Sequence, residues 1–312
     1  MDFEKLNALG KKKIPFIFIS NFELDKLVVI PLSELDSHDI EYSINEDFYS
    51  TRHTHQLKKF PMQYSEYKDK FDKVIEKIKS GETYLLNLTA HTAIQSDLNL
   101  QEIYSVVNAH YKIRYKDEFV CFSPEKFVQI KGNKISTFPM KGTIDANIED
   151  AENKILNDKK EMAEHVMVVD LLRNDLSMVS KNVRVEKFRY ITKIKAHKQE
   201  ILQVSSHISG ELSDNWEETI GDIFKKLLPC GSISDTPKKS TLEIIKKIEK
   251  YDRGFYSGIF GIYDGKTLDS GVLIRFIQNT TKGLVYKSGG GITLDSKPQK
   301  EYNELLDKIY LP

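Results

Sequence analysis

The chain has 312 residues, which at about 150 residues per domain allows either two domains or one large domain. Its 46 lysines and arginines balance 46 aspartates and glutamates, and this neutral total argues against a nucleic-acid or anionic-membrane binder. No segment approaches the ~20 apolar residues of a membrane-spanning helix. Cys121 and Cys230 are too few for a disulfide framework, so we expect a soluble protein of the reducing cytoplasm.

The predicted elements begin with short β-branched or aromatic runs separated by polar turns. Apolar residues at helical spacing predict a helix over 64–80, which Gly81 ends, and Asp158 can cap a second helix over 158–175. Further helices are expected over 242–250 and 301–309. Strands are expected over 15–22, 26–31, 40–44, 83–89, 119–122, 126–130, 134–138, 183–190, 199–212, 258–263, 272–278 and 284–288.

These helices and strands are clustered rather than strictly alternating, which favours an α+β fold over a doubly wound parallel sheet. The sequence contains no internal repeat and no linker-like stretch rich in proline, glycine or serine. We therefore expect one large domain over residues 1–312.

Two of the predicted helices carry pairs of glutamates three residues apart, Glu161 with Glu164 and Glu301 with Glu304. Residues at this spacing share one face of a helix. If the two helices face each other, the four carboxylates form an oxygen-only site that suits Mg²⁺. The spacing is also common on solvated helices, and Glu161 could simply complete a helix cap. Spacing alone leaves both interpretations open.

Arginine is scarce, with seven residues in the chain, so an arginine among apolar neighbours favours carboxylate or phosphate recognition. Arg275 lies within the apolar sequence Gly-Val-Leu-Ile-Arg-Phe-Ile, and we expect it to bind substrate. Arg173 and Arg253 could equally form structural ion pairs. The run Gly289–Gly291 can aim backbone N–H groups at an anion, or form a bulge or tight turn.

Lys141 lies beside apolar residues in Phe-Pro-Met-Lys-Gly-Thr, where a lysine can serve as a nucleophile or base, or be a plain surface charge. Glu125 follows Ser-Pro after an apolar strand, and is a candidate general acid or a solvated turn carboxylate. His165 lies on the glutamate-bearing helix and is expected to be packed rather than to bind a metal.

Taken in order, several segments resemble the chorismate-utilising enzymes, which include component I of anthranilate and aminodeoxychorismate synthases, and the isochorismate and salicylate synthases. The resembling segments are 123–125, 139–143, 164–176, 231–238, 253–258, 274–275 and 289–296, with Glu301 and Glu304. They span residues 81–312, whereas residues 1–80 match loosely. The resemblance implies an α+β chorismate-binding domain, built as a β-sheet sandwich with helices outside.

Position 141 separates members of this family. Anthranilate synthases typically have Pro-Ile-Ala-Gly-Thr, and aminodeoxychorismate synthases have Pro-Ile-Lys-Gly-Thr. This chain has Pro-Met-Lys-Gly-Thr, so it resembles the p-aminobenzoate branch of folate synthesis. Two alternatives are another chorismate enzyme and a non-catalytic homologue that binds chorismate or a glutaminase. The joint presence of Glu125, Lys141, Glu164 and Glu304 argues against the non-catalytic homologue.

The resemblance also implies roles for individual residues. Lys141 would attack C2 of chorismate while Glu125, as general acid, helps the C4 hydroxyl leave, and ammonia would then add at C4. Mg²⁺ would be held through Glu164 and Glu304, supported by Glu161 and Glu301. The expected substrate-binding residues are Thr143, Ser232, Tyr256, Arg275, Gly289, Gly290, Gly291 and Lys308. The chain has no amidotransferase nucleophile elbow, so a separate glutamine amidotransferase subunit would supply the ammonia.

Two positions depart from the family pattern. Gln203 stands where many relatives have histidine, so an acid–base role at that position is absent here. Asp235 adds a charge where glycine is usual, which could alter ammonia entry or the local backbone.

Overall fold

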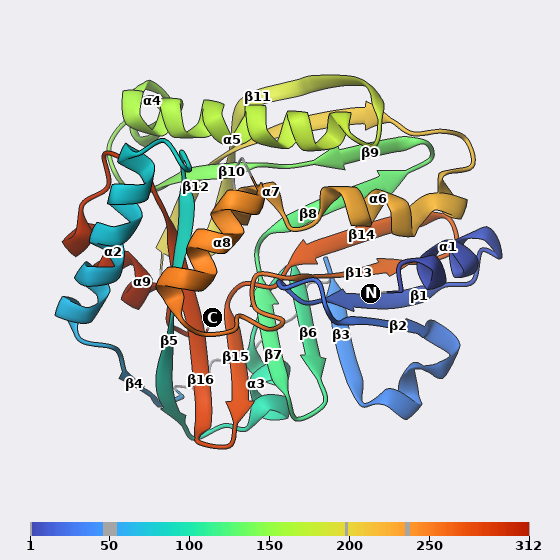
Figure 1. The fold of residues 1–312 in the computed structure, drawn as a ribbon, viewed down its shortest axis with the longest axis horizontal. Helices are drawn as coiled ribbons and strands as arrows, with labels where there is room; N and C mark the ends of the chain where they lie inside the picture. The colour runs from blue at the N-terminus through green and yellow to red at the C-terminus, as the bar shows by residue number, and fades with distance from the viewer. Residues whose placement is uncertain (1, 46–54, 197–198, 235–237, 312) are drawn as a thin grey trace.

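The protein was analysed as a computed structural model that describes residues 2–45, 55–196, 199–234 and 238–311; Asp235 lies outside these residues. Two antiparallel sheets form the fold (Figure 1). Among the described residues, the first sheet comprises β1 (Phe16–Ser20), β2 (Leu27–Pro31), β8 (Lys126–Lys131), β9 (Lys134–Thr137), β10 (Met140–Asp145), β11 (Lys181–Ala196), β12 (Gln199–Glu211), β13 (Ile259–Tyr263) and β14 (Thr267–Val272). The second comprises β3 (Ile40–Ile44), β4 (Leu57–Phe60), β5 (Leu86–Ser96), β6 (Tyr111–Tyr115), β7 (Phe119–Ser123), β15 (Phe276–Thr280) and β16 (Gly283–Ile292).

Strand β1 of the first sheet is buried on both of its faces. All five of its residues are buried. Ile17 and Ile19 pack in a core shared with the second sheet, whereas Phe16 and Phe18 pack in a core shared with the helices. Successive side chains of a strand point to opposite faces, so a strand covered on both faces is apolar throughout.

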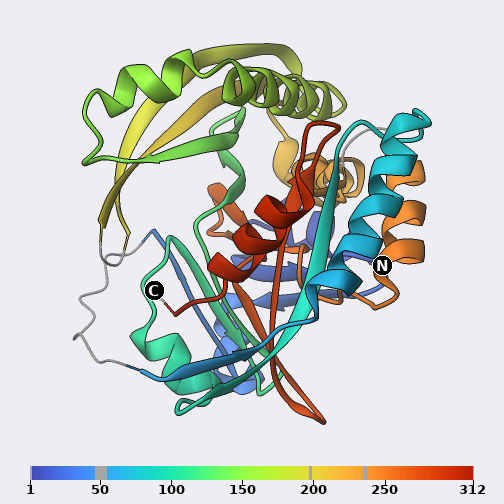
Figure 2. The ribbon, with the colours of Figure 1, turned by 90° about the vertical axis from the view of Figure 1, so that its left-hand side faces the viewer.

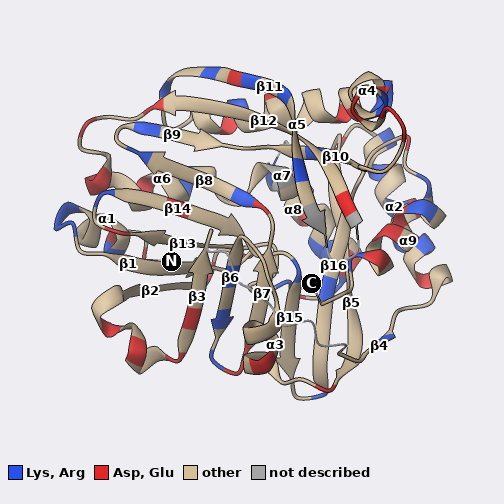
Figure 3. Cartoon of the chain, turned by 180° about the vertical axis from the view of Figure 1, so that it is seen from behind, with Lys and Arg blue, Asp and Glu red and all other residues tan. Residues whose placement is uncertain are grey.

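The helices lie outside this pair of sheets, as the resemblance implies, and the predicted α+β class is confirmed (Figure 1). Their bounds are α1 (Glu4–Lys11), α2 (Tyr64–Lys79), α3 (Leu100–Val106), α4 (Ala151–Asn157), α5 (Lys159–Ser177), α6 (Ile220–Leu227), α7 (Gly231–Ser234), α8 (Lys238–Glu249) and α9 (Pro298–Asp307). None of the described helices is long and apolar enough to cross a membrane. Charges of both signs are spread over the helices and strands (Figure 3).

The expected strand over 272–278 is wrong. Strand β14 ends at Val272 in the first sheet, and β15 begins at Phe276 in the second. Arg275 occupies the break with a φ of +53°, a conformation that is uncommon for a residue other than glycine. The chain leaves one sheet here and enters the other, so Arg275 lies at the junction of the sheets rather than within a strand.

A second strand pair crosses the same junction in the opposite direction. Glu125 lies between β7 of the second sheet and β8 of the first. The two crossings are hydrogen-bonded to each other, since Phe122 N donates to Arg275 O at 3.1 Å and Val272 N donates to Glu125 O at 3.0 Å. The fold therefore brings Glu125 and Arg275, about 150 residues apart in the sequence, to one place.

Candidate active site

The first part of the site is the N-terminal end of α5. The helix begins after Asp158, whose side chain accepts the N–H groups of Lys160 and Glu161. Lys141 on β10 reaches this end, and its Nζ lies 2.9 Å from Oε2 of Glu164. Lys160 Nζ lies 3.5 Å from the other oxygen of Glu164. The first glutamate pair and the candidate nucleophile are therefore brought together.

The second part is helix α9, which lies beneath the layer of α4 and α5 with α2 to one side (Figure 2). Glu301 on α9 is buried, and Glu304 is one turn further along. Lys308 joins the helix to β16: its Nζ is 2.8 Å from Glu304 Oε1 and donates to Gly289 O at 2.8 Å.

The glycine run faces these groups from a regular strand. Gly289–Gly291 belong to β16 and pair with β5, so the interpretation as a bulge or turn is wrong. A Cβ atom built on Gly290 would lie 3.6 Å from Glu301 Oε2 and 3.9 Å from Glu304 Oε1. The absence of a side chain at Gly290 therefore leaves the space beside the α9 glutamates open.

Electrostatic interactions connect the two helices through Lys141. Burial alone would lower the pKa of the lysine, but the charges and hydrogen bond of Glu164, with Glu161 and Glu304, outweigh it, and the pKa is raised. Burial and the neighbouring Glu304 raise the pKa of Glu301. Burial opposes ionisation of Glu304 too, but Lys308 and Lys141 lower its pKa overall. The charges of all four glutamates thus act on one lysine.

Whether these residues fit a metal ion is a question of chemistry and of geometry. The donor set contains carboxylate oxygens alone, which fits a hard cation such as Mg²⁺ that binds through few carboxylates and keeps several waters. Within the described residues, no three acidic, histidine or cysteine side chains lie close enough together to hold a metal. Glu164 and Glu304 are instead paired with Lys141 and Lys308.

At the sheet junction, Tyr256 and Arg275 lie in a second, more apolar region. Tyr256 is buried, its pKa is raised mainly by burial, and the Arg275 charge opposes this rise. The Nε of Arg275 is buried and has no hydrogen-bond partner among the described residues. The guanidinium lies 5.6 Å from the ring centre of Tyr310. An unpaired buried N–H beside a tyrosine is suited to receiving an anionic group.

The second predicted catalytic group, Glu125, is half-buried at the same junction. Its carboxylate is near enough to Cys230 to help burial raise the pKa of that thiol. Cys230 immediately precedes α7, so Glu125 faces the segment that carries Ser232. The side chain of Ser232 is not among those that the structure describes. Thr143 is exposed on β10, where it pairs with Gln203 of β12.

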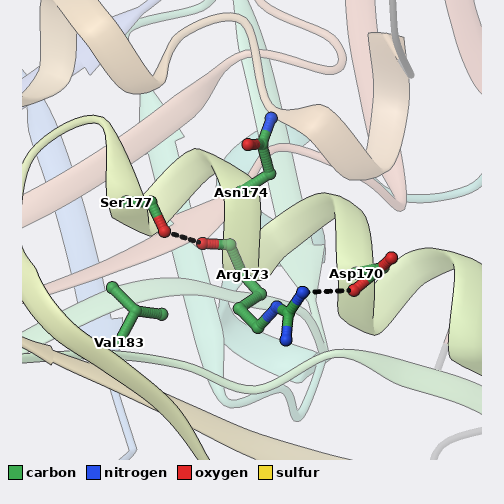
Figure 4. A pocket seen from close by; sticks show the side chains of 5 residues that line it. All are labelled: Asp170, Arg173, Asn174, Ser177 and Val183. Carbon is green, nitrogen blue, oxygen red and sulfur yellow. Dashed lines mark hydrogen bonds and ion pairs between the residues drawn. The ribbon is translucent and has the colours of Figure 1, made fainter.

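Arg253 and Arg173 both form ion pairs, the structural alternative that the sequence left open for them. Arg253 is 1% exposed and forms a buried ion pair with Glu249, with Nη2 2.6 Å from Oε1. Arg173 is exposed and pairs with Asp170 at 3.0 Å. It lines a surface pocket of about 360 Å³ on the outer side of α5, together with Asn174, Ser177 and Val183 (Figure 4). None of the predicted site residues lines this pocket.

The sequence interpretation missed a buried histidine contact. His165 Nδ1 lies 3.2 Å from the carbonyl oxygen of Lys141, and its Nε2 lies 2.7 Å from Ser206 Oγ. The expectation of a packed histidine was correct as to burial, because His165 is fully buried. Its contact with Lys141 had no signal in the sequence, because the two residues meet only when β10 packs against α5.

Comparison with known proteins gives the family. Residues 28–311 match the family model described as chorismate binding enzyme. The chain belongs to the chorismate-binding enzymes. The match extends into the first eighty residues, where the motifs resemble the family loosely.

Relatives of this chorismate-binding enzyme carry several names. It is 49% identical to an uncharacterized PabA-like protein of Haemophilus influenzae, over 99% of this chain and 95% of that protein. It is 34% identical to aminodeoxychorismate synthase component 1 of Bacillus subtilis, over 78% of this chain and 54% of that one. It is 31% identical to anthranilate synthase component 1 of Archaeoglobus fulgidus, over 78% and 61%. The enzyme thus spans about half the length of the aminodeoxychorismate synthase that it matches.

Solved structures give the same fold. Anthranilate synthase component I of Streptococcus pneumoniae superposes with a TM-score of 0.68 and 25% identity, over 81% of this chain and 58% of that one. The menaquinone-specific isochorismate synthase of Escherichia coli superposes with a TM-score of 0.73 and 14% identity, over 97% and 79%. The second likeness shows the fold alone.

Proposed function

We propose that this chorismate-binding enzyme is the component I of an aminodeoxychorismate synthase, which converts chorismate and ammonia to 4-amino-4-deoxychorismate. The observation that carries the proposal is the position of Lys141, whose amine lies 2.9 Å from Glu164 Oε2 and interacts electrostatically with the other three glutamates. An amine at this position can form a bond to the substrate ring, and the alanine of anthranilate synthases cannot.

In the proposed reaction, the neutral Nζ of Lys141 forms a bond to C2 of chorismate. The two ring double bonds shift, and the C4–oxygen bond breaks. Glu125 gives its proton to the departing oxygen, which leaves as water. Ammonia then bonds to C4, the double bonds shift back, and the C2–nitrogen bond to Lys141 breaks. The product keeps its enolpyruvyl group and a non-aromatic ring.

We propose Mg²⁺ as the cofactor, held through Glu164 and Glu304 with Glu161 and Glu301 in support. Bound there, Mg²⁺ supplies positive charge that neutralises the glutamates and attracts a substrate carboxylate. In its absence, Glu164 favours the protonated form of Lys141, which is not nucleophilic. The pKa of Glu301 is raised mainly by burial and less by the neighbouring Glu304, and a bound cation would favour its ionised form.

Substrate recognition is proposed to use both parts of the site, since chorismate is a dicarboxylate. One carboxylate would lie beside the α9 glutamates, over the open face of Gly290 and close to Lys308. The second would meet Arg275, whose buried Nε has no partner among the described residues, and Tyr256. Ser232 and Thr143 would complete the contacts.

We propose that ammonia comes from a separate glutamine amidotransferase subunit. A glutaminase needs a reactive thiolate. The two cysteines of this chain, Cys121 and Cys230, are buried, and burial raises the pKa of both thiols. Neither is therefore suited to attack glutamine. The PabA-like and component 1 names of relatives agree with a two-subunit enzyme.

The test mixes the purified protein with chorismate, Mg²⁺ and ammonium, with and without an added aminodeoxychorismate lyase. The proposal predicts that p-aminobenzoate forms only when the lyase is present. Fluorescent anthranilate without the lyase would identify an anthranilate synthase instead. Isochorismate without any use of ammonium would identify an isomerase, and full recovery of chorismate would identify a non-catalytic homologue.

A further inference from the structure

Lys141 lies in an irregular part of its strand. Strand β10 pairs with β12 at Met140↔Ser205 and again at Thr143↔Gln203, with a shift of register between the two pairs. The shift takes Lys141 and Gly142 out of regular pairing, and Gly142 adopts a φ of +96°. A bulge of this kind re-aims a side chain, but the peptide within it needs hydrogen-bond partners from outside the ladder.

His165 provides such a partner. The carbonyl oxygen of Lys141 can only accept, so the ring atom Nδ1, at 3.2 Å, carries the hydrogen. Ser206 Oγ accepts the backbone N–H of Arg189 at 2.9 Å and is 2.7 Å from Nε2. With a neutral ring, the Ser206 hydroxyl donates to Nε2, and every hydrogen in this chain of bonds finds an acceptor.

The far end of the chain of bonds is fixed as well. Arg189 has a φ of +48° within a register shift of β11, between Lys187 and Tyr190. Its side chain donates to the carbonyl oxygens of Ile155 at 2.9 Å and Leu156 at 2.6 Å, at the end of α4. Backbone strain of this kind persists only where the surroundings enforce it. The backbone N–H of Arg189 therefore holds the Ser206 hydroxyl in a fixed position.

Helix α5 thus contacts both the side chain and the backbone of Lys141. Glu164 lies at the side-chain Nζ, and His165, the next residue, lies at the backbone carbonyl. The carboxylate acts on the charge of the lysine, whereas the imidazole acts on the orientation of its peptide. A displacement of about 1 Å at a reacting atom can reduce a rate about 100-fold, so the peptide contact bears directly on reactivity.

We propose that His165 and Ser206 are positioning residues that hold the Lys141 peptide so that its Nζ points at the reacting carbon. This inference rests on the proposed role of Lys141. It assigns no proton transfer and no metal contact to His165. The part of His165 that matters is the N–H at Nδ1, with Ser206 and Arg189 orienting the ring behind it.

The test compares His165→Asn with His165→Gln. The amide nitrogen of Asn can reach the position of Nδ1 and donate to the Lys141 carbonyl, whereas the amide of Gln reaches the position of Nε2 and meets Ser206. His207→Gln is the matched control, because His207 also pairs with a serine, with Nε2 3.0 Å from Ser136 Oγ. His207 follows Ser206 on β12, so its side chain points to the opposite face of the strand.

The first readout is the rate of chorismate consumption, which does not depend on the product. His165→Gln should lower kcat about tenfold or more with KM within about threefold of the wild-type value, and His165→Asn should retain clearly more of kcat. His207→Gln should match the wild type. Equal losses in the Asn and Gln variants, or a larger loss in Asn, would overturn the inference.

The second readout is labelling of Lys141 by an amine reagent, followed by peptide mass spectrometry. If the backbone peptide of Lys141 is no longer held, its Nζ should move away from Glu164 and become accessible to the reagent. Lys141 should therefore label several-fold faster in His165→Gln and in Ser206→Ala than in His165→Asn. Equal labelling in all the variants overturns the inference. If the wild type consumes no chorismate, the proposed function fails, and labelling still decides the positioning role. Ser206→Ala decides it if a ring variant does not fold.

Discussion

Lys141 Nζ lies 2.9 Å from Oε2 of Glu164, and this contact joins the candidate nucleophile to the candidate metal site. Because Glu164 raises the pKa of Lys141, the lysine of the free enzyme is held in its unreactive, protonated form. Binding of a cation at the glutamates would weaken that hold. The same carboxylate can therefore make the reactivity of the lysine depend on the metal.

Replacing Lys141 tests whether its charge or its amine matters. Lys141→Arg keeps a positive charge beside Glu164, but a guanidinium stays protonated and does not attack carbon. We expect both Lys141→Arg and Lys141→Ala to lower kcat for chorismate consumption at least about 1,000-fold. If the Arg variant worked at a rate near that of the wild type, the charge alone would be sufficient and the lysine would not be a nucleophile.

Two neighbouring glycines should respond differently to alanine. A Cβ at Gly290 meets Glu301, Lys308 and Glu304 at 3.6 to 3.9 Å, which is ordinary contact. A Cβ at Gly289 would approach Leu88 O to 2.7 Å. Gly290→Ala should therefore melt near the wild-type temperature but raise KM for chorismate.

Gly289→Ala is the comparison, and it should lower the melting temperature because the neighbouring strand must shift. Thermal unfolding and steady-state kinetics of the two variants check the pair. An unchanged KM in a folded Gly290→Ala protein would show that substrate does not approach this face.

Metal dependence should follow the α9 glutamates. A chelator should abolish turnover, and Glu304→Gln should raise the Mg²⁺ concentration for half-maximal activity at least about tenfold. Asp307→Asn, an exposed change on the same helix, is the control and should leave that concentration unchanged. Since the pKa of Glu301 is raised, protons compete with the metal as pH falls, and more Mg²⁺ should be required at lower pH. Full activity in the chelator would contradict this account.

Lys287 gives a pH dependence of stability that is independent of catalysis. Burial lowers its pKa to about 8, from an ordinary value of 10.5. Between these values the unfolded chain binds more protons than the folded protein, so this lysine makes the free energy of unfolding rise with pH, by at most about 1.4 kcal/mol per pH unit.

Urea unfolding at several values between pH 8 and 10 checks this prediction. The wild type should gain stability relative to Lys287→Met as the pH rises through that range. Parallel stability curves for the two proteins would mean that Lys287 titrates normally.

Much of the fold could be predicted from local patterns in the sequence. The helical spacing of Phe71, Val74 and Ile78 and the capping residue Asp158 located α2 and α5 almost to the residue. The short helices α1, α3, α4, α6 and α7 were missed. They span eight residues or fewer, and the stability of such short helices comes mainly from tertiary packing.

The sequence pattern could nominate the residues of the candidate site but not their geometry. Glutamate spacing on two helices indicated a shared face, and the structure brings both helices to Lys141. Arg275 was misplaced because the run around it is apolar on both sides of a change of sheet, which periodicity cannot detect. The contacts of His165 and Ser206 depend on register shifts in β10 and β11, which no residue pattern indicates.

The most direct measurement is the mass of the peptide that carries Lys141 after the enzyme is incubated with chorismate and Mg²⁺ but no ammonium. Without ammonia the second half of the reaction cannot proceed. The account predicts an adduct on Lys141 with the mass of chorismate less one water, which disappears when ammonium is added and is absent from Lys141→Arg. An unmodified Lys141 in an enzyme that converts chorismate and ammonium to 4-amino-4-deoxychorismate would contradict it.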